Sequence, residues 1–472
     1  MGLLRPQIFT TERALTSFVT QPGARVAAMI GTAVWGPINQ NILVGSLSEF
    51  ISLFGDDKSG VGVSGIKGAD LFFRNGGVLK FVRIEDGTAA EADTTFTDNV
   101  TNQLTFTAKF KGSYGNNIRV TISANSINAA NVNVSITDGQ RTENFTNAGQ
   151  GYADSDDIVT AVNDSVSGSV LVVAEVHNDG DGEELPDAGN AFLSGGLDGE
   201  TGTLTTAINN AYDNVLEVEE FNFLLIPGNT DNAIHATIVG KLNNRDNTEK
   251  LYSRFITGVA LNEPVNTTLA RTASGKRITI VAPNTQYNDR VTGNLVTLDG
   301  SYLACAYAGL LCRIGVQISG THETVNVPGL SINTTTNKQF YTKTEQEQLL
   351  QARILPISKI GNSIQAVRGV TREPSTTSIY FDEVVVDITD FIRASVENYL
   401  NTAIGKPNTE ARRKVWSSGI DSILETAKRN EIIQEYDTTS IIVGASPDTF
   451  IATVNVKPSY SVNFINLNIN IN

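Results

Sequence analysis

The sequence predicts a multi-domain α/β and α+β protein with an inserted all-β domain. Three observations predict it. Strand-like and helix-like stretches alternate in two regions of the chain, as is typical of a largely parallel sheet. Between them lies a run of β-rich segments divided by Gly, Asn and Asp turns, and near the carboxy-terminal end two long helices precede short strands. A chain of 472 residues is too long for one core, so we expect it to divide into several domains.

The composition is that of a folded, acidic chain. Hydrophobic residues make up 40% and charged residues 18%, which is enough apolar material to bury cores. The net charge of −15 disfavours binding to nucleic acid or anionic lipid, because both are negatively charged. No signal peptide is apparent, and no stretch nears the roughly 18 apolar residues that span a membrane. We expect a soluble protein made in a cytosol.

The first α/β region precedes the β-rich run. Residues 26–39 read as a buried strand followed by a Gly-Pro turn, and residues 47–55 read as a short amphipathic helix. Residues 68–84 predict a helix, a break at two glycines and a second strand. From Asp93 to Gly199 the β-rich segments predict the inserted domain.

The second α/β region follows Gly199. Strands are predicted within 221–228, 253–261 and 277–284, with a helix over 233–245 between the first two. Residues 301–316 read as a buried helix that contains both cysteines. Cys305 and Cys312 are about 10 Å apart along such a helix, too far for a disulfide, so we interpret both as small core residues.

A third region begins near residue 352 and carries two long helices, over 390–405 and 409–429. In the second helix five residues share one face, which predicts that this face packs on a core. A strand-turn-strand over 440–458 leads to the end of the chain. The residues of the shared face are Trp416, Ile420, Ile423, Leu424 and Ala427.

The last residues alternate strictly between apolar side chains and asparagine, the pattern of a strand with one apolar face. No turn follows, and such a flat, uncharged edge pairs readily with another chain. The strand is therefore either captured inside its own domain or donated to a neighbour. Its apolar residues are Ile465, Leu467, Ile469 and Ile471.

Motifs for catalysis, cofactors and metals are weak or missing. GVGVSG (60–65) follows a polar segment rather than a strand, so it does not predict a dinucleotide site. No phosphate-binding G-x-x-x-x-G-K-[ST] loop and no G-x-S-x-G elbow occurs, and no histidine has partners at metal-ligand spacing. NDGDGEE (178–184) lacks a full set of calcium ligands. We expect no catalytic, cofactor or metal site.

A basic cluster, Lys406, Arg412, Arg413 and Lys414, reverses the sign of the chain locally. It is either a solvated helix start paired with Glu410, which stabilises little, or a contact for an acidic partner surface. The two readings are equally supported by the spacing.

Seven motifs occur in order along nearly the whole chain: RPQIF, GTAVWGP, EFISLFG, FFRNGG, GSYGNNI, GGLDG and IPG. In this the sequence resembles the contractile tail sheath proteins of tailed bacteriophages and related injection machines. Gln7 replaces a glycine of the opening motif, and VRGVTR (367–372) is a loose version of the family's G-x-R-T.

The resemblance implies a virion tail subunit, assembled in the host cytoplasm, that stacks in rings, with six-fold symmetry expected, and contracts to drive a tube through an envelope. Its partners would be further copies, the tube protein, and baseplate and terminator proteins. It implies no enzyme activity and no cofactor. It also implies terminal arms that pair with neighbouring subunits, through Pro6, Ile8, Phe9 and the apolar residues of the last strand.

The domains implied are an arm (1–22), a subtilisin-like α/β domain without a triad (23–92 and 200–355), an outward-facing β domain (93–199), a tube-facing α+β domain (356–457) and a strand arm (458–472). Hinges are expected at 10–22 and 455–461. The rival interpretations are a degenerate hydrolase on the α/β domain and another virion structural protein.

Overall fold

A computed structural model describes residues 25–56, 63–97, 102–176, 185–200, 202–375, 377–444 and 446–463. The described chain forms two compact units. The core unit comprises residues up to Gly315 and Ser319–Glu383, and the carboxy-terminal unit comprises Val316–Ile318 and Val384–Val462.

The core unit is built on an eight-stranded sheet in the order β18-β17-β13-β12-β11-β1-β3-β2. The six inner strands are parallel, and each edge strand is antiparallel to its neighbour. The strands are β1 (Val26–Gly31), β2 (Asn41–Val44), β3 (Val78–Arg83), β11 (Phe223–Leu225), β12 (Arg254–Gly258), β13 (Ile278–Ala282), β17 (Leu355–Ile360) and β18 (Ser363–Ala366).

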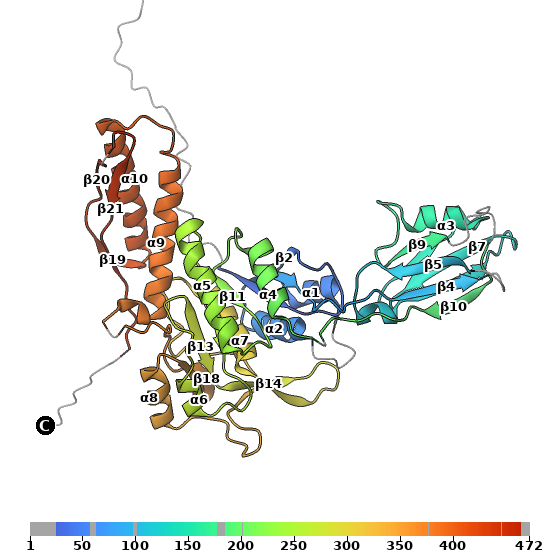
Figure 1. Cartoon of the computed structure of the whole chain (residues 1–472), viewed down its shortest axis with the longest axis horizontal. Coiled ribbons are helices and arrows are strands. Elements are labelled where there is room, and N and C mark those ends of the chain that lie inside the picture. Colours follow the sequence, from blue (N-terminus) through green and yellow to red (C-terminus); the bar gives the residue numbers. More distant parts are fainter. Residues whose placement is uncertain are drawn as a thin grey trace, which may run out of the picture. The chain divides into compact units, whose positions relative to one another are not determined.

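Both faces of this sheet are covered. In β1, Ala27 and Met29 pack into one hydrophobic cluster and Ala28 and Ile30 into another, as alternation along a strand requires. The first cluster includes α7, and α2 packs on α7; α4 and α5, which lie side by side in Figure 1, contribute to the second. These helices are α2 (Ser64–Phe73), α4 (Thr205–Ala211), α5 (Asn232–Thr248) and α7 (Gly300–Arg313).

Smaller elements complete the core unit. They are α1 (Leu47–Phe54), α6 (Val265–Leu269), α8 (Lys343–Gln351) and a three-stranded sheet of β14 (Asn284–Asn288), β15 (Leu295–Leu298) and β16 (Gly329–Ser331). Both cysteines are buried in α7 and are not joined in a disulfide, as the sequence predicted.

The inserted β domain forms two antiparallel sheets and one helix, α3 (Ser155–Val162). One sheet has the order β10-β6-β7-β8 and the other β4-β5-β9. The strands are β4 (Asp93–Thr97), β5 (Asn102–Ala108), β6 (Arg119–Ala124), β7 (Val132–Thr137), β8 (Thr142–Phe145), β9 (Val172–Val176) and β10 (Gly189–Phe192).

The root of the inserted domain is packed against the loop after β1. The ring of Trp35 contacts Phe110 at 5.2 Å and Tyr114 at 5.3 Å between centroids. Arg83, fully buried at the end of β3, donates from Nη1 to the carbonyls of Gly36 (2.7 Å) and Lys111 (2.8 Å). The domain is thus attached by packed side chains as well as by its two chain connections.

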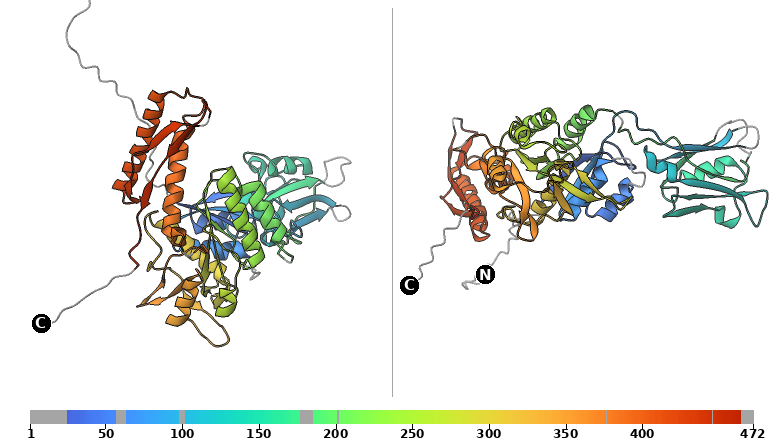
Figure 2. Two further views of the ribbon diagram at one scale, coloured as in Figure 1. Left: turned by 60° about the vertical axis from the view of Figure 1, so that its left-hand side comes forward. Right: turned by 90° about the horizontal axis from the view of Figure 1, so that it is seen from below.

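The carboxy-terminal unit consists of two helices and two pairs of strands, which lie side by side in Figure 2. Helix α10 buries the five residues that the sequence placed on one face. The elements are α9 (Glu383–Asn401), whose first residue belongs to the core unit, α10 (Glu410–Arg429), β19 (Ile433–Tyr436), β20 (Ser440–Val443), β21 (Phe450–Thr453) and β22 (Val456–Pro458).

Three boundaries differ from the sequence-based expectations. The expected start of the third domain at 356 falls inside the core sheet, because β17 and β18 pair there. Helix α9 begins at Glu383 rather than at 390, although its start contains the β-branched run Val384, Val385, Val386. The expected hinge at 455–461 and the arm starting at 458 overlap β22, which pairs with β19.

Candidate assembly interface

The residues proposed for the terminal arms lie outside the described part of the chain. These are Pro6, Ile8 and Phe9 at the start and Ile465, Leu467, Ile469 and Ile471 at the end. The calcium-like loop 178–184 and the first half of GVGVSG (60–62) also lie outside it. The described chain does contain a surface of the kind to which a further strand can be added.

That surface is a two-stranded ribbon, which we call the C-terminal ribbon (residues 433–443 and 450–458). Its two ladders, β19 with β22 and β20 with β21, are antiparallel. The amide of Asp437 donates to the carbonyl of Asn455 at 3.1 Å, so pairing continues between the ladders. Within the described residues each ladder has two strands and no third.

One face of the C-terminal ribbon is packed on its own unit. The ring of Phe450 stacks on Trp416 of α10 at 5.2 Å, with an angle of 24° between the ring planes. Val443 is the cross-strand partner of Phe450, so it belongs to this face. The stack ties the ribbon to α10.

The opposite face carries an exposed apolar pair beside the polar pair Ser440 and Thr453. Ile442 and Ile451 are cross-strand partners with 57% and 52% of their surfaces exposed. Two-stranded ribbons are marginal in isolation and gain stability from further strands. A strand with one apolar side, added at either edge, would extend this face and cover part of it.

The four residues of the basic cluster differ in their side-chain contacts. Arg413 donates to Asn408 Oδ1 at 2.8 Å, and Asn408 in turn donates to the carbonyls of Pro447 and Thr449, both at 3.0 Å. Arg413 therefore braces the start of α10 against the ribbon turn. Lys414 pairs with Glu410 at 2.8 Å in a highly exposed salt bridge, and this contact lowers the pKa of Glu410.

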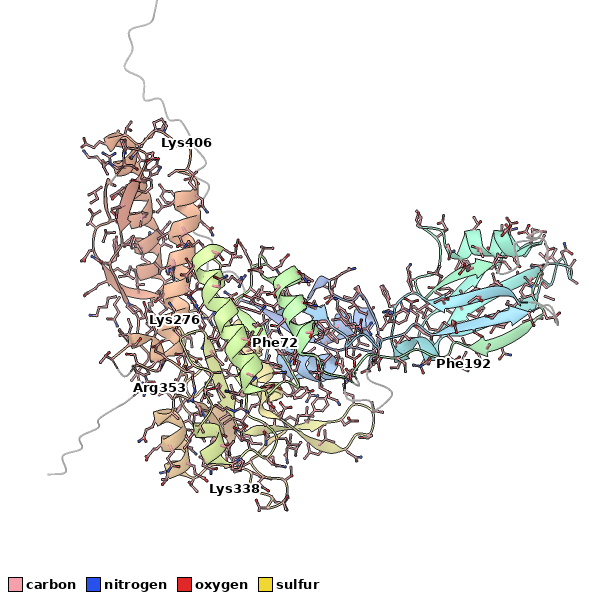
Figure 3. The ribbon with its side chains drawn as sticks, viewed as in Figure 1. Phe72, Phe192, Lys276, Lys338, Arg353 and Lys406 are labelled. Carbon is pink, nitrogen blue, oxygen red and sulfur yellow. The ribbon has the colours of Figure 1, made fainter. Side chains whose placement is uncertain are left out.

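The other two cations are exposed. Within the described chain, no side-chain hydrogen bond or ion pair is formed by Lys406, labelled in Figure 3 at the turn between α9 and α10, or by Arg412. Large apolar side chains are their neighbours in sequence: Ile404 is 77% and Val415 64% exposed. Arg412 and Val415 are three residues apart on α10, so they share one side of the helix. This tip has two uncommitted cations beside exposed apolar surface.

The core unit has a cleft of about 470 Å³ at the carboxyl ends of β1 and β11, the place where α/β enzymes carry their sites. Its lining includes Thr32, Ser64 and Asp299. The two hydroxyls serve the backbone: Thr32 N donates to Ser64 Oγ at 3.1 Å and Ser64 N to Thr32 Oγ1 at 3.0 Å. Burial raises the pKa of Asp299, the N-cap of α7.

Among the residues that the structure describes, no histidine lines this cleft. His235 is buried, contacts Thr257 Oγ1 at 3.0 Å and Asn229 O at 3.3 Å, and has its pKa lowered to about 4, chiefly by burial. The cleft thus lacks a histidine base for either hydroxyl.

The described residues contain no group of three His, Cys, Asp or Glu side chains suited to a metal ion. No helix in the described part of the chain has the length and apolar character needed to cross a bilayer.

Sequence reasoning found the ribbon strands and the basic cluster but missed the exposed Ile442–Ile451 face. Its only signal was an apolar residue on each strand of a hairpin, which does not reveal which face packs on α10. The split within the basic cluster was also missed, because the contact of Arg413 with Asn408 depends on the turn before the helix.

Two family comparisons match. Residues 202–372 match the phage tail sheath protein central domain, and residues 375–472 match the phage tail sheath C-terminal domain. Together these cover more than half of the chain. A comparison with curated protein sequences finds no match.

Solved structures share the fold. The sheath tail protein of Desulfitobacterium hafniense is similar with a TM-score of 0.68 at 15% identity, covering 96% of this chain and 100% of that one. The sheath tail protein Lin1278 of Listeria innocua gives 0.69 at 14% identity, with 94% of each chain covered. The helical sheath of the anti-feeding prophage in its contracted state gives 0.55 at 12%, covering 100% and 99%. The expected mixed α/β multi-domain fold is confirmed by these similarities.

Proposed function

Because the chain belongs to the phage tail sheath proteins and is a structural subunit of a tail sheath, we propose that it polymerises as stacked rings around a tube and contracts to drive that tube through a target envelope. The observation that carries the proposal is the C-terminal ribbon, whose ladders have two strands each within the described residues and whose outer face exposes the apolar pair Ile442 and Ile451.

The ribbon is the acceptor for terminal arms of neighbouring subunits. Residues 464–472 extend roughly 30 Å as a strand, which is enough to leave one subunit and reach another. Their apolar side chains would lie beside Ile442 and Ile451, while the asparagines face water. The amino-terminal segment with Pro6, Ile8 and Phe9 is the second candidate strand, and main-chain hydrogen bonds would hold both.

The tip with Lys406 and Arg412 faces the tube. Exposed cations set register and association rate more than affinity, and the exposed Ile404 and Val415 supply apolar contact. Arg413 and Lys414 belong to the same basic cluster, but their contacts within the unit support a structural role for them.

The inserted β domain faces outward. Residues 93–199 contain 15 acidic and 4 basic residues, so they carry −11 of the net charge of −15. So concentrated a charge favours solvent over packing against identical copies. The domain's role would be at the particle surface.

The core unit has a scaffold role without catalysis, and its parallel sheet is subtilisin-like in arrangement. The cleft supports this, since its hydroxyls are committed to backbone amides and no histidine lines it. The partners would be the tube, baseplate and terminator proteins of a six-fold tail or tail-like particle assembled in the host cytoplasm.

The test is electron microscopy of the purified full-length chain, alone and with its tube protein. We expect tubes of stacked rings. Monodisperse monomers at high protein concentration in both samples would contradict the proposal.

A further inference from the structure

Helix α9 starts where the two compact units meet in the sequence. In this part of the chain the core unit extends to Glu383 and the carboxy-terminal unit resumes at Val384. The first residue of the helix therefore belongs to one unit and the rest of the helix to the other. The contacts of residues 379–383 therefore determine at which point of the chain one unit can move without the other.

Glu383 is held by a buried set of charged and polar groups. Its carboxylate is 1% exposed and pairs with Arg254 Nη1 at 2.9 Å. Tyr307 donates its hydroxyl to the same carboxylate, and the amide of Gly320 donates to it at 3.2 Å. Arg254 Nη1 also donates to Thr279 Oγ1 at 2.8 Å, within the parallel sheet. All these partners belong to the core unit.

The space around this carboxylate is full. A side chain at position 369 would place its Cβ 2.1 Å from Glu383 Oε1, so only glycine fits there. Breaking the pair would leave Arg254 charged and 1% exposed, which costs more than the pair itself contributes. The carboxylate has one well-packed position.

The residues before Glu383 are also fixed to the core unit. The guanidinium groups of Arg353 and Arg368 lie 4.5 and 5.0 Å from the centroid of the Phe381 ring. The ammonium of Lys276 lies 5.1 Å from the centroid of the Tyr380 ring; Figure 3 labels Arg353 and Lys276.

The backbone of this segment is paired as well. The amide of Thr371 donates to the carbonyl of Phe381 at 2.8 Å, and Val370 forms an antiparallel bridge with Asp382. Cation–π, main-chain and buried ionic contacts thus act on consecutive residues.

We propose that residues 379–383 are a fixed root of α9 that stays on the core unit in every state of the sheath. This rests on the proposed contraction. Any change in the orientation of the carboxy-terminal unit then arises beyond Val384, and displacement of that unit is passed to the core sheet through Glu383 and Arg254. A cluster that must break several contacts together moves as part of the packed core.

The first test uses an engineered disulfide, Val370→Cys with Asp382→Cys. The hydrogen bonds on either side of this bridge make it a non-hydrogen-bonded pair, with about 4.5 Å between Cα atoms, within the range of disulfides. The native cysteines are buried and do not compete. Assembled sheaths of the oxidised variant should contract to the same extent as sheaths of the reduced variant. The two contraction rates should agree within about twofold. Contraction that is blocked by oxidation and restored by a reductant would overturn the proposal.

The second test needs no sheath, so it separates this inference from the proposed function. In the monomer, Glu383→Gln should speed hydrogen exchange at the amides of Gly320 and Thr371 by at least about tenfold. The exposed Glu347→Gln on α8 is the matched control and should change neither amide. Unchanged exchange in a folded Glu383→Gln protein would overturn the role of the ion pair. If that variant does not fold, the disulfide test still decides whether the root moves.

Discussion

The core sheet and the C-terminal ribbon are both built from hydrogen-bonded strands, but they differ in how many strands they have and in how far their faces are buried. The core sheet has eight strands with apolar clusters on both faces, and residues such as Met29 and Phe81 are fully buried. The ribbon has two strands in each ladder within the described residues, one face on α10, and Ile442 and Ile451 exposed on the other. Within the described residues the core sheet buries apolar clusters on both faces, whereas we propose that the ribbon gains strands from neighbouring chains. Stability and assembly are therefore carried by different regions, and mutations should separate them.

Removing residues 464–472 should have the largest effect on assembly. The cut follows Asn463, so Ser459, which donates from its amide to Ile432 O at 3.2 Å, stays in place. We expect a folded monomer with an unchanged far-ultraviolet spectrum and no sheaths, because the donated strand is gone. Electron microscopy and circular dichroism check this.

A matched pair of double variants sharpens that result. Leu467→Asp with Ile469→Asp should copy the truncation, whereas Asn466→Ser with Asn468→Ser should leave sheaths intact, since the apolar side is kept. Sheaths of normal length from the aspartate variant would refute the donated strand.

Phe81→Ala should lower the stability of the monomer, whereas Ile451→Ala should reduce sheath formation. Phe81 is fully buried, with rings of Phe50 and Phe54 at 4.8 and 4.7 Å, so its loss should lower the free energy of unfolding by about 3–5 kcal/mol. Ile451→Ala removes an exposed side chain and should change monomer stability by about 0.5 kcal/mol or less while reducing sheath formation.

Fluorescence can follow the two units separately, because the chain has two tryptophans. Trp35 lies in the core unit and Trp416 in the carboxy-terminal unit, so single-tryptophan variants report on one unit each. Equal loss of stability from Phe81→Ala and Ile451→Ala would remove the distinction between the regions.

Charge reversal at the tip should weaken binding to the tube but not folding. Lys406→Glu with Arg412→Glu should reduce co-assembly with tubes by about tenfold or more at low salt, and less at high salt. Lys428→Glu with Arg429→Glu, at the other end of α10, is the control with the same charge change. If both double variants bind tubes alike in sedimentation, the tip has no specific role.

Acid should have a smaller effect than the substitutions above, and it should destabilise the core unit before the carboxy-terminal unit. Burial opposes ionisation of Glu263, but hydrogen bonds from Arg271 and the Ala260 amide outweigh it, so the pKa of Glu263 lies below its ordinary value of 4.5. A lowered folded-state pKa contributes stability that is present above pH 4.5 and is lost as the pH falls through the folded value. Glu263→Gln should flatten the decline in stability below pH 4.5.

Glu410→Gln is the control for this pH effect. The pKa of Glu410 is lowered by Lys414, but both side chains are highly exposed and the pair is screened by solvent. Thermal melts from pH 6 to 3 should therefore be the same for Glu410→Gln and the unchanged protein. Identical pH profiles for Glu263→Gln and the unchanged protein would contradict the assignment.

The sequence predicted the elements whose periodicity reflects packing. The face of α10 was found because its apolar residues repeat with the helical period, and α7 was found as a continuous run of small and apolar residues that reads as a buried helix. The sheath resemblance was confirmed by the family comparisons. The domain boundary near 356 was missed because the partners of β17 and β18 are distant in sequence.

Other features depend on tertiary context. The run Val384–Val386 has strand propensity, yet α9 begins at Glu383, whose carboxylate is buried on Arg254. Neither that ion pair nor the difference between Arg412 and Arg413 has a local signature. The ion pair joins segments that are distant in sequence, and the contact of Arg413 depends on the conformation of the turn that holds Asn408. Sequence periodicity reports packing but neither of these polar contacts.

Hydrogen–deuterium exchange on monomers and assembled sheaths tests the central claim most directly. If strands from neighbours complete the C-terminal ribbon, amides of residues 440–443 and 450–453 should gain about a hundredfold protection on assembly, while those of β1, β12 and β13 should stay as they are. Sheaths in which these ribbon amides exchange as fast as in the monomer would contradict the account.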